Sequence, residues 1–248
     1  MSPYSRREFM QTGAALVASA AVAGSARAAD GRRVRHAVIG VGNQGKAHTR
    51  YFSRLDNCEV VGLAEIDPER LQAGRELLPA DAEVRLTTDF RELLADETID
   101  SVSIATCDHW HTPVALHALK AGKHVYVEKP CSHNVREGFV LAEAARKTGK
   151  CVQQGTQSRS SEGIQAAMGF MRDGGLGQVR MAKAIDHQFR EPIGRAPVMD
   201  PPRGVDYDLW IGPGEMRPFT TNRWHYNWHW FWDFGCGDIA NDGIHQLD

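Results

Sequence analysis

The stretch HAVIGVGNQG, residues 36–45, joins a short apolar run to a glycine-rich turn. Gly40, Gly42 and Gly45 have the spacing G-x-G-x-x-G, and a segment with helical periodicity follows directly. Between a strand and a helix, the first glycine permits a tight turn, the second lets a pyrophosphate approach the backbone, and the third allows close packing. The stretch therefore predicts a dinucleotide-binding turn; a turn without a ligand is the alternative.

Polar residues around this turn favour one particular dinucleotide. Asn43 and Gln44 open the predicted helix, whose free N–H groups and dipole attract an anion. Glu65 ends the next apolar run, where a carboxylate accepts hydrogen bonds from the adenosine ribose and repels a 2′-phosphate. We therefore expect NAD as the cofactor, and the nearby Lys46 keeps NADP as the less favoured alternative.

Further apolar runs follow at regular spacing, separated by segments with helical periodicity. They are rich in Val and Ile without polar alternation, which is typical of strands buried on both faces by crossover helices. The alternation predicts a doubly wound parallel α/β sheet over residues 33–154. The expected strands are residues 36–41, 59–66, 83–88, 101–106, 124–128 and 150–154, and the expected helices are residues 45–55, 68–78, 90–96, 113–121 and 135–148.

Composition and charge exclude several classes of protein. The chain has 248 residues, which is long enough for two domains. Its net charge is -2, which gives no sign of a nucleic-acid or membrane-surface partner. Its five cysteines are scattered and include no CxxC, which argues against a disulfide framework or a zinc site.

The first 29 residues have the composition of an export signal. Paired arginines at 6–7 precede the apolar run TGAALVASAAVAG, and Ala26-Arg27-Ala28 matches an A-x-A cleavage site. The arrangement resembles a twin-arginine signal, so we expect a periplasmic protein that engages the twin-arginine export machinery. An ordinary secretory leader or an anchor is the alternative. The twin-arginine route carries folded proteins, often with a cofactor already bound.

The segment AGKHVYVEKP, residues 121–130, identifies a family. It is accompanied in order by the glycine turn, by Asp108-x-x-His111 after the fourth run, and by Gln157-x-Arg159 after the sixth. This set resembles the Gfo/Idh/MocA oxidoreductases, which include glucose–fructose oxidoreductase and inositol dehydrogenase. Residues 208–248 resemble the exported, twin-arginine subgroup of that family.

The resemblance implies roles for the residues after the fourth and fifth strands. Glu128 would contact the nicotinamide ribose, Lys129 would act as acid/base or orient the reacting hydroxyl, and Pro130 would follow a cis bond. A solvated lysine at a strand end is the alternative for Lys129. Cofactor contacts are also implied for Thr106, Asp108 and His111, and a substrate contact for Arg159.

One departure from the family pattern and one alternative concern the loop after the fourth strand. Cys107 stands where the family usually has proline, which puts the rigidity of the loop in doubt. His109 and His111 also have the spacing of a metal-binding pair. Because no third ligand follows at a suitable local spacing, we do not expect a metal.

Aromatic and polar side chains alternate along residues 224–232. If this segment is extended, aromatic rings occupy one face and His225, Asn227 and His229 the other. The aromatic face is suited to packing in a core or against another subunit. The polar face is suited to sugar hydroxyls, so His225 or His229 is a candidate substrate contact.

The last twelve residues, Gly237 to Asp248, resemble the start of a substrate-facing helix. Relatives carry an aspartate four residues before a histidine there, and this chain has Asn241 before His245. The neighbouring Asp242 is rotated by about 100° on a helix and does not replace that carboxylate. We expect Lys129 and His245 to be catalytic and Asn241 to position the substrate. A histidine bonded to a backbone carbonyl is the alternative for His245.

A second domain is expected over residues 155–248. The family implies an α+β domain with a large open, mostly antiparallel sheet, and a homo-oligomer when that domain is complete. Few residues are available for such a sheet, so we expect a fragment or truncated product with an unfinished substrate site.

Together these features predict an exported NAD-dependent oxidoreductase. It would move hydride between a secondary alcohol of a sugar, polyol or glycoside and a tightly held nicotinamide cofactor. A glycosidase that uses NAD for transient oxidation and elimination is one alternative. A cofactor-binding remnant without activity is another.

Overall fold

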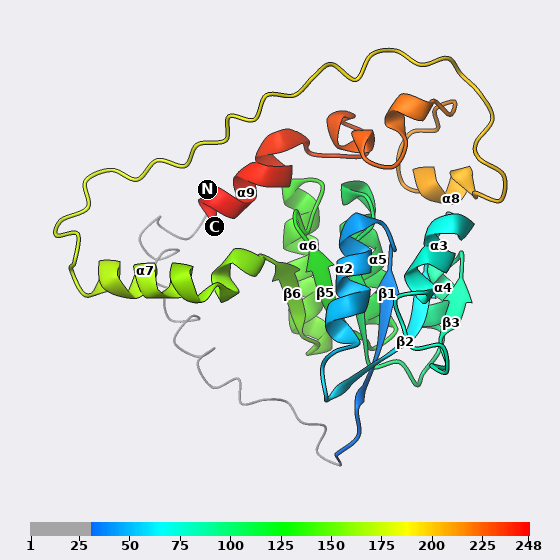
Figure 1. The fold of residues 1–248 in the computed structure, drawn as a ribbon, viewed down its shortest axis with the longest axis horizontal. Coiled ribbons are helices and arrows are strands. Elements are labelled where there is room, and N and C mark those ends of the chain that lie inside the picture. The colour runs from blue at the N-terminus through cyan, green and yellow to red at the C-terminus, as the bar shows by residue number, and fades with distance from the viewer. Residues whose placement is uncertain (1–30) are drawn as a thin grey trace. The chain divides into compact units, whose positions relative to one another are not determined.

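The computed structural model describes residues 31–248, so the predicted signal sequence at residues 1–29 lies outside the described residues. Val34–Asp248 form one compact unit. Figure 1 shows a set of parallel strands flanked by helices. Among residues 31–248, no helix has both the length and the apolar character needed to cross a bilayer.

Six parallel strands form one sheet in the order β3-β2-β1-β4-β5-β6. The order reverses between β1 and β4, so the carboxyl ends of these strands flank a crevice where ligands bind in such sheets. The doubly wound sheet predicted from the sequence is therefore confirmed. The strands are β1 (Val34–Ile39), β2 (Cys58–Ala64), β3 (Arg85–Thr87), β4 (Ser101–Ile104), β5 (His124–Glu128) and β6 (Val152–Gly155).

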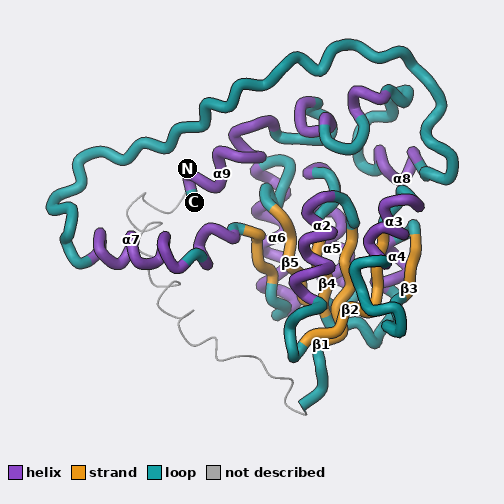
Figure 2. Tube along the Cα trace, viewed as in Figure 1, coloured by secondary structure: helices purple, strands orange, loops and turns teal. Residues whose placement is uncertain are grey.

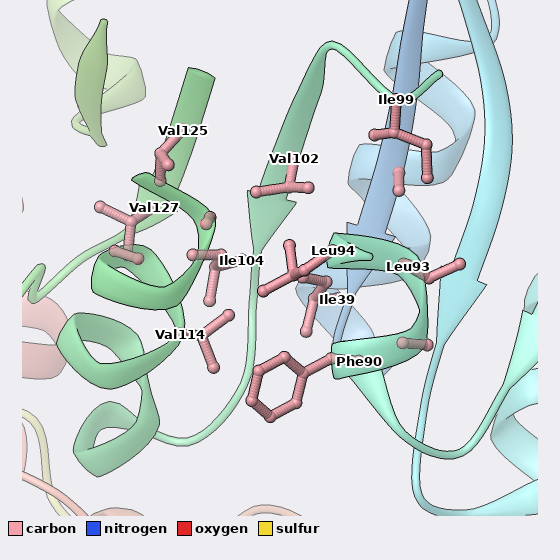
Figure 3. Close-up of a cluster of buried hydrophobic side chains, with 14 of the residues drawn as sticks. Ile39, Phe90, Leu93, Leu94, Ile99, Val102, Ile104, Val114, Val125 and Val127 are labelled. Atoms are coloured by element: carbon pink, nitrogen blue, oxygen red, sulfur yellow. The ribbon is translucent and has the colours of Figure 1, made fainter. Parts of the chain in front are cut away.

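The connecting helices cover both faces of the sheet. They are α2 (Asn43–Phe52), α3 (Pro68–Arg75), α4 (Phe90–Leu94), α5 (Asp108–Lys120) and α6 (Val135–Thr148). Alternate residues of β1 point to opposite faces: Val38 packs with Leu71 of α3, and Ile39 packs with α4 and α5. Figure 3 shows Phe90 and Leu94 of α4 beside Ile39 in the larger of these two clusters.

Helix α5 begins earlier than the sequence predicted. Proline is favoured at the first helical position, which pointed to a start at Pro113. The helix starts instead at Asp108, and Pro113 lies inside it. The prediction was wrong because the residues 108–112 are held by contacts with distant backbone groups, which outweigh the local preference of proline.

The chain after β6 forms short helices joined by long loops. They are η2 (Gln157–Ser160), α7 (Glu162–Arg172), α8 (Tyr207–Ile211), η3 (Thr221–Arg223), η4 (Asn227–Trp230), η5 (Ile239–Gly243) and α9 (Ile244–Leu247). Figure 2 shows the long loop between α7 and α8. Residues 156–248 contain no strand, so the antiparallel sheet of the second domain stays a prediction.

The aromatic segment at residues 224–232 is not an extended strand, so the expected alternation of two faces is wrong. Residues Asn227–Trp230 form the 3₁₀ turn η4. Trp228 and Phe234 are buried against Trp210 and Ile211 of α8. A strand needs a neighbouring strand to satisfy its N–H and C=O groups, and the described part of this region offers none.

Candidate active site

The glycine turn has the shape of a pyrophosphate cradle. Gly40 has φ +82°, and a Cβ there would lie 2.6 Å from the Ala105 oxygen. A Cβ on Gly45 would lie 1.8 Å from the Gly40 oxygen, so only glycine permits this approach. Gly42 precedes α2, whose first turn has no side-chain cap and no acidic residue. Its free N–H groups suit an anion, and the cradle therefore fits a dinucleotide.

Glu65 lies beside this turn, immediately after β2. Its Oε2 accepts a hydrogen bond from the Val41 N–H at 2.7 Å, and its Oε1 accepts one from the Asp67 N–H at 3.2 Å. Burial raises the pKa of Glu65, while these backbone hydrogen bonds and Arg70 act against the rise. The carboxylate lines the cavity at the position where the fingerprint places the adenosine ribose.

One cavity of about 310 Å³ extends from the glycine turn to the turn after β5. The cavity lies at the carboxyl ends of the strands. Helix α8 and residues 224–229 form one of its walls. The predicted site residues that line it are Gly40, Gly42, Asn43, Gln44, Glu65, Thr106, Asp108, His111, Glu128, Lys129, His225 and Asn241. The structure thus brings most of the predicted site together.

Glu128 is held by three side chains. It is 4% exposed, and its Oε1 accepts hydrogen bonds from Gln157 Nε2 at 2.6 Å, His48 Nε2 at 2.9 Å and Gln44 Nε2 at 3.2 Å. Burial alone would raise the pKa of Glu128, but the hydrogen bond and charge interaction with His48 contribute to a net lowering. The carboxylate is therefore kept ionised and fixed in orientation.

Lys129 and Asn241 meet in the cavity although they are far apart in the sequence. Lys129 Nζ donates to the Asn241 main-chain oxygen at 2.6 Å and to its Oδ1 at 3.0 Å. The Lys129–Pro130 peptide bond is cis, as the resemblance implied. Asn241 is 7% exposed and lies on η5, a π-helical turn. Asn241 therefore contacts the lysine itself, and its role in positioning the substrate stays a prediction.

Three predicted site residues do not line the cavity: Gly45, His245 and Arg159. His245 follows the π-helical turn, in which hydrogen bonds run from i to i+5, so residues four apart do not stack on one face as in an α-helix. Arg159 pairs with Asp248, with 2.6 Å between Nε and Oδ2, and its side chain is 67% exposed. The catalytic role of His245 and the substrate role of Arg159 therefore have no support from this geometry.

The first residues of α5 hold other parts of the chain in place. Asp108 Oδ2 accepts from the Cys236 N–H at 3.0 Å. Both ring nitrogens of His109 face backbone oxygens, Nε2 that of Trp210 at 3.1 Å and Nδ1 that of Phe234 at 3.3 Å. Burial lowers the pKa of His109 to about 4. These residues position the C-terminal wall of the cavity on the nucleotide-binding sheet.

Both ring nitrogens of His111 also face backbone oxygens. Its Nδ1 lies 2.7 Å from the Pro130 oxygen and its Nε2 lies 3.1 Å from the Thr106 oxygen. It thereby joins the loop after β4 to the turn after β5. Among residues 31–248, no group of three His, Cys, Asp or Glu side chains is arranged to hold a metal ion.

The aromatic segment brings two histidines to the cavity wall. His225 Nε2 lies 3.3 Å from Asp67 Oδ2, and burial lowers the pKa of His225 to about 4. His229 Nδ1 lies 2.5 Å from the Tyr226 oxygen, its ring stacks on Trp228 at 3.6 Å, and burial lowers its pKa. Both imidazoles are neutral at pH 7.

Three residues of the site were not predicted. His48 lies four residues after Gln44, so helical spacing places both on one face of α2 toward Glu128. Arg70 lies in the first turn of α3, and its Nη1 would be 3.1 Å from a Cβ on Gly42. Helical periodicity after the fingerprint could have identified these two residues. Trp210 lines the cavity only through tertiary packing, which leaves no local signal.

Family comparison covers both parts of the chain. Residues 34–156 match the Gfo/Idh/MocA oxidoreductase family model described as an NAD-binding Rossmann fold. Residues 188–248 match the model for the C-terminal alpha/beta domain of the same family.

Curated relatives include several members of one group. A glycosyl hydrolase family 109 protein of Saccharopolyspora erythraea is 31% identical over 218 residues, which cover 77% of this chain and 47% of that protein. Another, from Stenotrophomonas maltophilia, is 29% identical over 228 residues, with 88% and 49% covered. The chain thus spans less than half the length of these relatives.

Solved structures share the fold. An NAD-binding protein from Listeria innocua superposes with a TM-score of 0.53 at 26% identity, covering 59% of this chain and 42% of that one. Scyllo-inositol dehydrogenase from Lactobacillus casei, solved with NAD(H) and scyllo-inositol, gives a TM-score of 0.54 at 21% identity, covering 59% and 43%. With the two family models and the glycine cradle, these matches lead to one conclusion: the chain belongs to the Gfo/Idh/MocA family of oxidoreductases, and its sheet is the NAD-binding Rossmann fold of that family.

Proposed function

We propose that the protein is an exported, NAD-dependent oxidoreductase that acts on a secondary alcohol of a sugar, polyol or glycoside. The observation that carries this proposal is the placement of Lys129 Nζ in the cavity, on Asn241, beside the buried Glu128. An amine, an amide and a carboxylate then converge where the nicotinamide end of the site is expected. Such a set suits hydroxyl chemistry and needs no metal.

Each of these residues has a distinct task. The bound nicotinamide supplies hydride transfer at its C4 carbon. Glu128, fixed by three donors, accepts hydrogen bonds from the nearby ribose hydroxyls. Lys129 donates a hydrogen bond to the reacting oxygen and takes up or returns the hydroxyl proton. Asn241 keeps Lys129 directed into the cavity but, as an amide, carries no charge to stabilise the ammonium.

The preference for NAD rests on the acidic end of the site. Glu65 lines the cavity directly after β2, so a 2′-phosphate at this position would face the Glu65 carboxylate. Arg70 lines the same region and offsets part of this repulsion. We infer that NAD binds more tightly than NADP.

Export is proposed from the paired arginines and the cleavage pattern of residues 1–29. A periplasmic enzyme has little free NAD available, so a cofactor bound before export and recycled within one site is consistent with this location. We propose accordingly that NAD is a resident cofactor and that the small-molecule substrate binds and leaves around it.

The second candidate function is an NAD-dependent glycosidase. The glycosyl hydrolase family 109 relatives favour it, since a glycosidase of this family would oxidise a sugar transiently, eliminate the substituent and reduce the product again. Such a reaction has no net redox change.

Stoichiometry distinguishes the two activities. The protein is incubated with p-nitrophenyl glycosides and with free sugars, with and without added NAD. Release of p-nitrophenol without added cofactor and without keto-sugar supports the glycosidase. Accumulation of NADH and keto-sugar in equal amounts supports the dehydrogenase. Neither product with any tested sugar, glycoside or polyol contradicts both.

Binding of NAD is tested separately by isothermal titration. We expect the wild type to bind NAD and Gly42→Glu to lose binding, because a glutamate there places a side chain and a negative charge where the pyrophosphate must approach. Failure of the wild type to bind would favour a remnant without cofactor.

A further inference from the structure

The adenosine end of the cavity is bordered by a residue from the C-terminal part of the chain. His225 lines the cavity, and its Nε2 lies 3.3 Å from Oδ2 of Asp67. Asp67 follows Glu65 by two residues, is 8% exposed, and caps helix α3 through its other oxygen. The imidazole of His225 therefore lies beside the side chains of the residues that follow β2.

His225 is held in an unusual backbone conformation. Its φ is +61°, the only positive value at a non-glycine residue among those described. Its main-chain oxygen accepts a hydrogen bond from Trp228 Nε1 at 2.9 Å, and its ring centroid lies 4.5 Å from that of Trp224. Trp228 is buried, so packing on both sides maintains the strained residue. Strain of this kind is retained mainly at functional sites.

Position along the sheet decides which end of the ligand His225 faces. Strands β2 and β5 are separated by three inter-strand spacings in the order β2-β1-β4-β5, which corresponds to about 14 Å. Lys129 follows β5, whereas Asp67 follows β2. The imidazole on Asp67 is therefore at the opposite end of the cavity from the lysine and too far from the reacting carbon to contact it.

The chemistry of this end matches an adenosine. The His225 side chain is 36% exposed; its partial burial first, and then the charge of Arg70, lower its pKa to about 4 against the effect of Asp67, so the imidazole is neutral at pH 7. A neutral imidazole offers one donor, one acceptor and an aromatic face. Ribose hydroxyls and the adenine ring present the matching donors, acceptors and face.

We propose that His225 belongs to the dinucleotide site and contacts the adenosine half of NAD, and that residues Trp224–His229 form the outer wall which retains the cofactor. This differs from the sequence-based expectation that His225 contacts the sugar. The inference rests on the proposed use of NAD and adds a residue, from outside the Rossmann fold, that controls how long NAD stays bound.

The test compares NAD and ADP binding by isothermal titration at pH 7.5, on protein from which any retained NAD has been removed. His225→Asn is the main variant, because asparagine tolerates a positive φ while its shorter amide does not reach as far. His225→Ala is the second variant, and His187→Ala, at an exposed position, is the matched control. Thermal unfolding of each variant shows that the fold is kept.

We expect both His225 variants to bind NAD and ADP about tenfold more weakly, by the same factor for each ligand, which corresponds to one hydrogen bond and ring contact. The control is expected to match the wild type. NAD weakened with ADP unchanged would place His225 elsewhere and overturn the inference. Equal affinities in the wild type and in both variants would overturn it too. If the wild type itself binds no NAD, the proposed function fails, and this inference fails with it.

Discussion

At the scale of single residues, Lys129 and Asn241 define the chemical end of the cavity. Nζ of Lys129 meets the main-chain oxygen and the amide oxygen of the same asparagine. The next residue, Asp242, instead contacts Gln188 and Arg190 on the surface. Asp242 Oδ2 also accepts a hydrogen bond from Asn241 Nδ2 at 3.3 Å, so it supports the amide that meets the lysine.

This arrangement predicts the effect of removing the amide. Asn241→Ala deletes the Oδ1 acceptor and leaves the main-chain oxygen, so Lys129 keeps one of two contacts. We expect kcat to fall about tenfold with little change in KM, the size expected for one hydrogen bond to a charged group. Steady-state kinetics on whichever sugar is found active measures the effect. Asn222→Ala is the matched control, because this asparagine lies outside the cavity and donates to the Gly194 oxygen, and an equal loss there would contradict a specific role for Asn241.

Gly45 allows a prediction about the cradle. A Cβ at this position would lie 1.8 Å from the Gly40 oxygen, so Gly45→Ala must displace backbone rather than side chain. We expect a loss of about 1–3 kcal/mol in the free energy of unfolding, with weakened NAD binding. Urea unfolding and titration measure the two effects.

Gly169→Ala is the control for this substitution. Gly169 lies in helix α7 with nothing within 4 Å of an added Cβ, so alanine there is expected to stabilise by about 0.5–1 kcal/mol. A Gly45→Ala protein as stable as the wild type would show that the turn can relax.

At the scale of elements, the start of α5 joins the C-terminal wall to the sheet. Asp108 and His109 together contact backbone groups of Cys236, Trp210 and Phe234. Two of these residues, Trp210 and Phe234, belong to the buried aromatic cluster of the wall. Short helices without a strand partner are thus held by side-chain contacts to one helix end.

His109→Ala is expected to loosen this wall. It removes an imidazole that lies between two buried carbonyl oxygens and, being neutral, donates a hydrogen bond to one of them, and it should cost about 1–3 kcal/mol of unfolding free energy. Limited proteolysis should cleave residues 207–236 faster than in the wild type, while the Rossmann part stays protected. His117→Ala, at an exposed position of the same helix, should change neither property. Equal cleavage rates in both variants would rule out the proposed holding role.

Some of these elements could be predicted from the sequence and others could not. The six strands were predicted because long Val- and Ile-rich runs between helical segments have few alternatives. The aromatic segment was misjudged because alternation of ring and polar side chains is equally compatible with 3₁₀ turns. The start of α5 was misplaced because proline is favoured locally at the first helical position, and distant contacts overrode this preference.

At the scale of the whole molecule, histidines buried in the neutral form connect stability to pH. His36 is 2% exposed and stacks on Phe52 at 3.9 Å, and burial lowers its pKa to about 3 from 6.5. His109 behaves similarly, with a pKa of about 4. In the unfolded chain both histidines take up a proton near pH 6.5, whereas the folded chain does not.

The lowered pKa values of these histidines make the protein less stable at acidic pH. Between pH 6.5 and about 3 the unfolded state binds more protons, so stability is present above pH 6.5 and is lost as the pH falls. We expect each histidine to lower the free energy of unfolding by about 1 kcal/mol between pH 7 and pH 5.5. Urea unfolding at the two pH values should show that His36→Gln reduces this difference by about that amount. His187→Gln should leave it unchanged, and an unaltered difference in His36→Gln would contradict the burial argument.

The sequence by itself determined the parallel sheet, the glycine cradle, Glu65 and the turn carrying Glu128 and Lys129, since these depend on local spacing within strand–turn–helix units. The tertiary structure alone decided that Asn241 meets Lys129, that His245 and Arg159 lie outside the cavity, and that His225 reaches Asp67. Those outcomes depend on how residues 207–248 pack on α5, where the contacts join residues about a hundred positions apart. The local periodicity of the sequence does not predict such contacts.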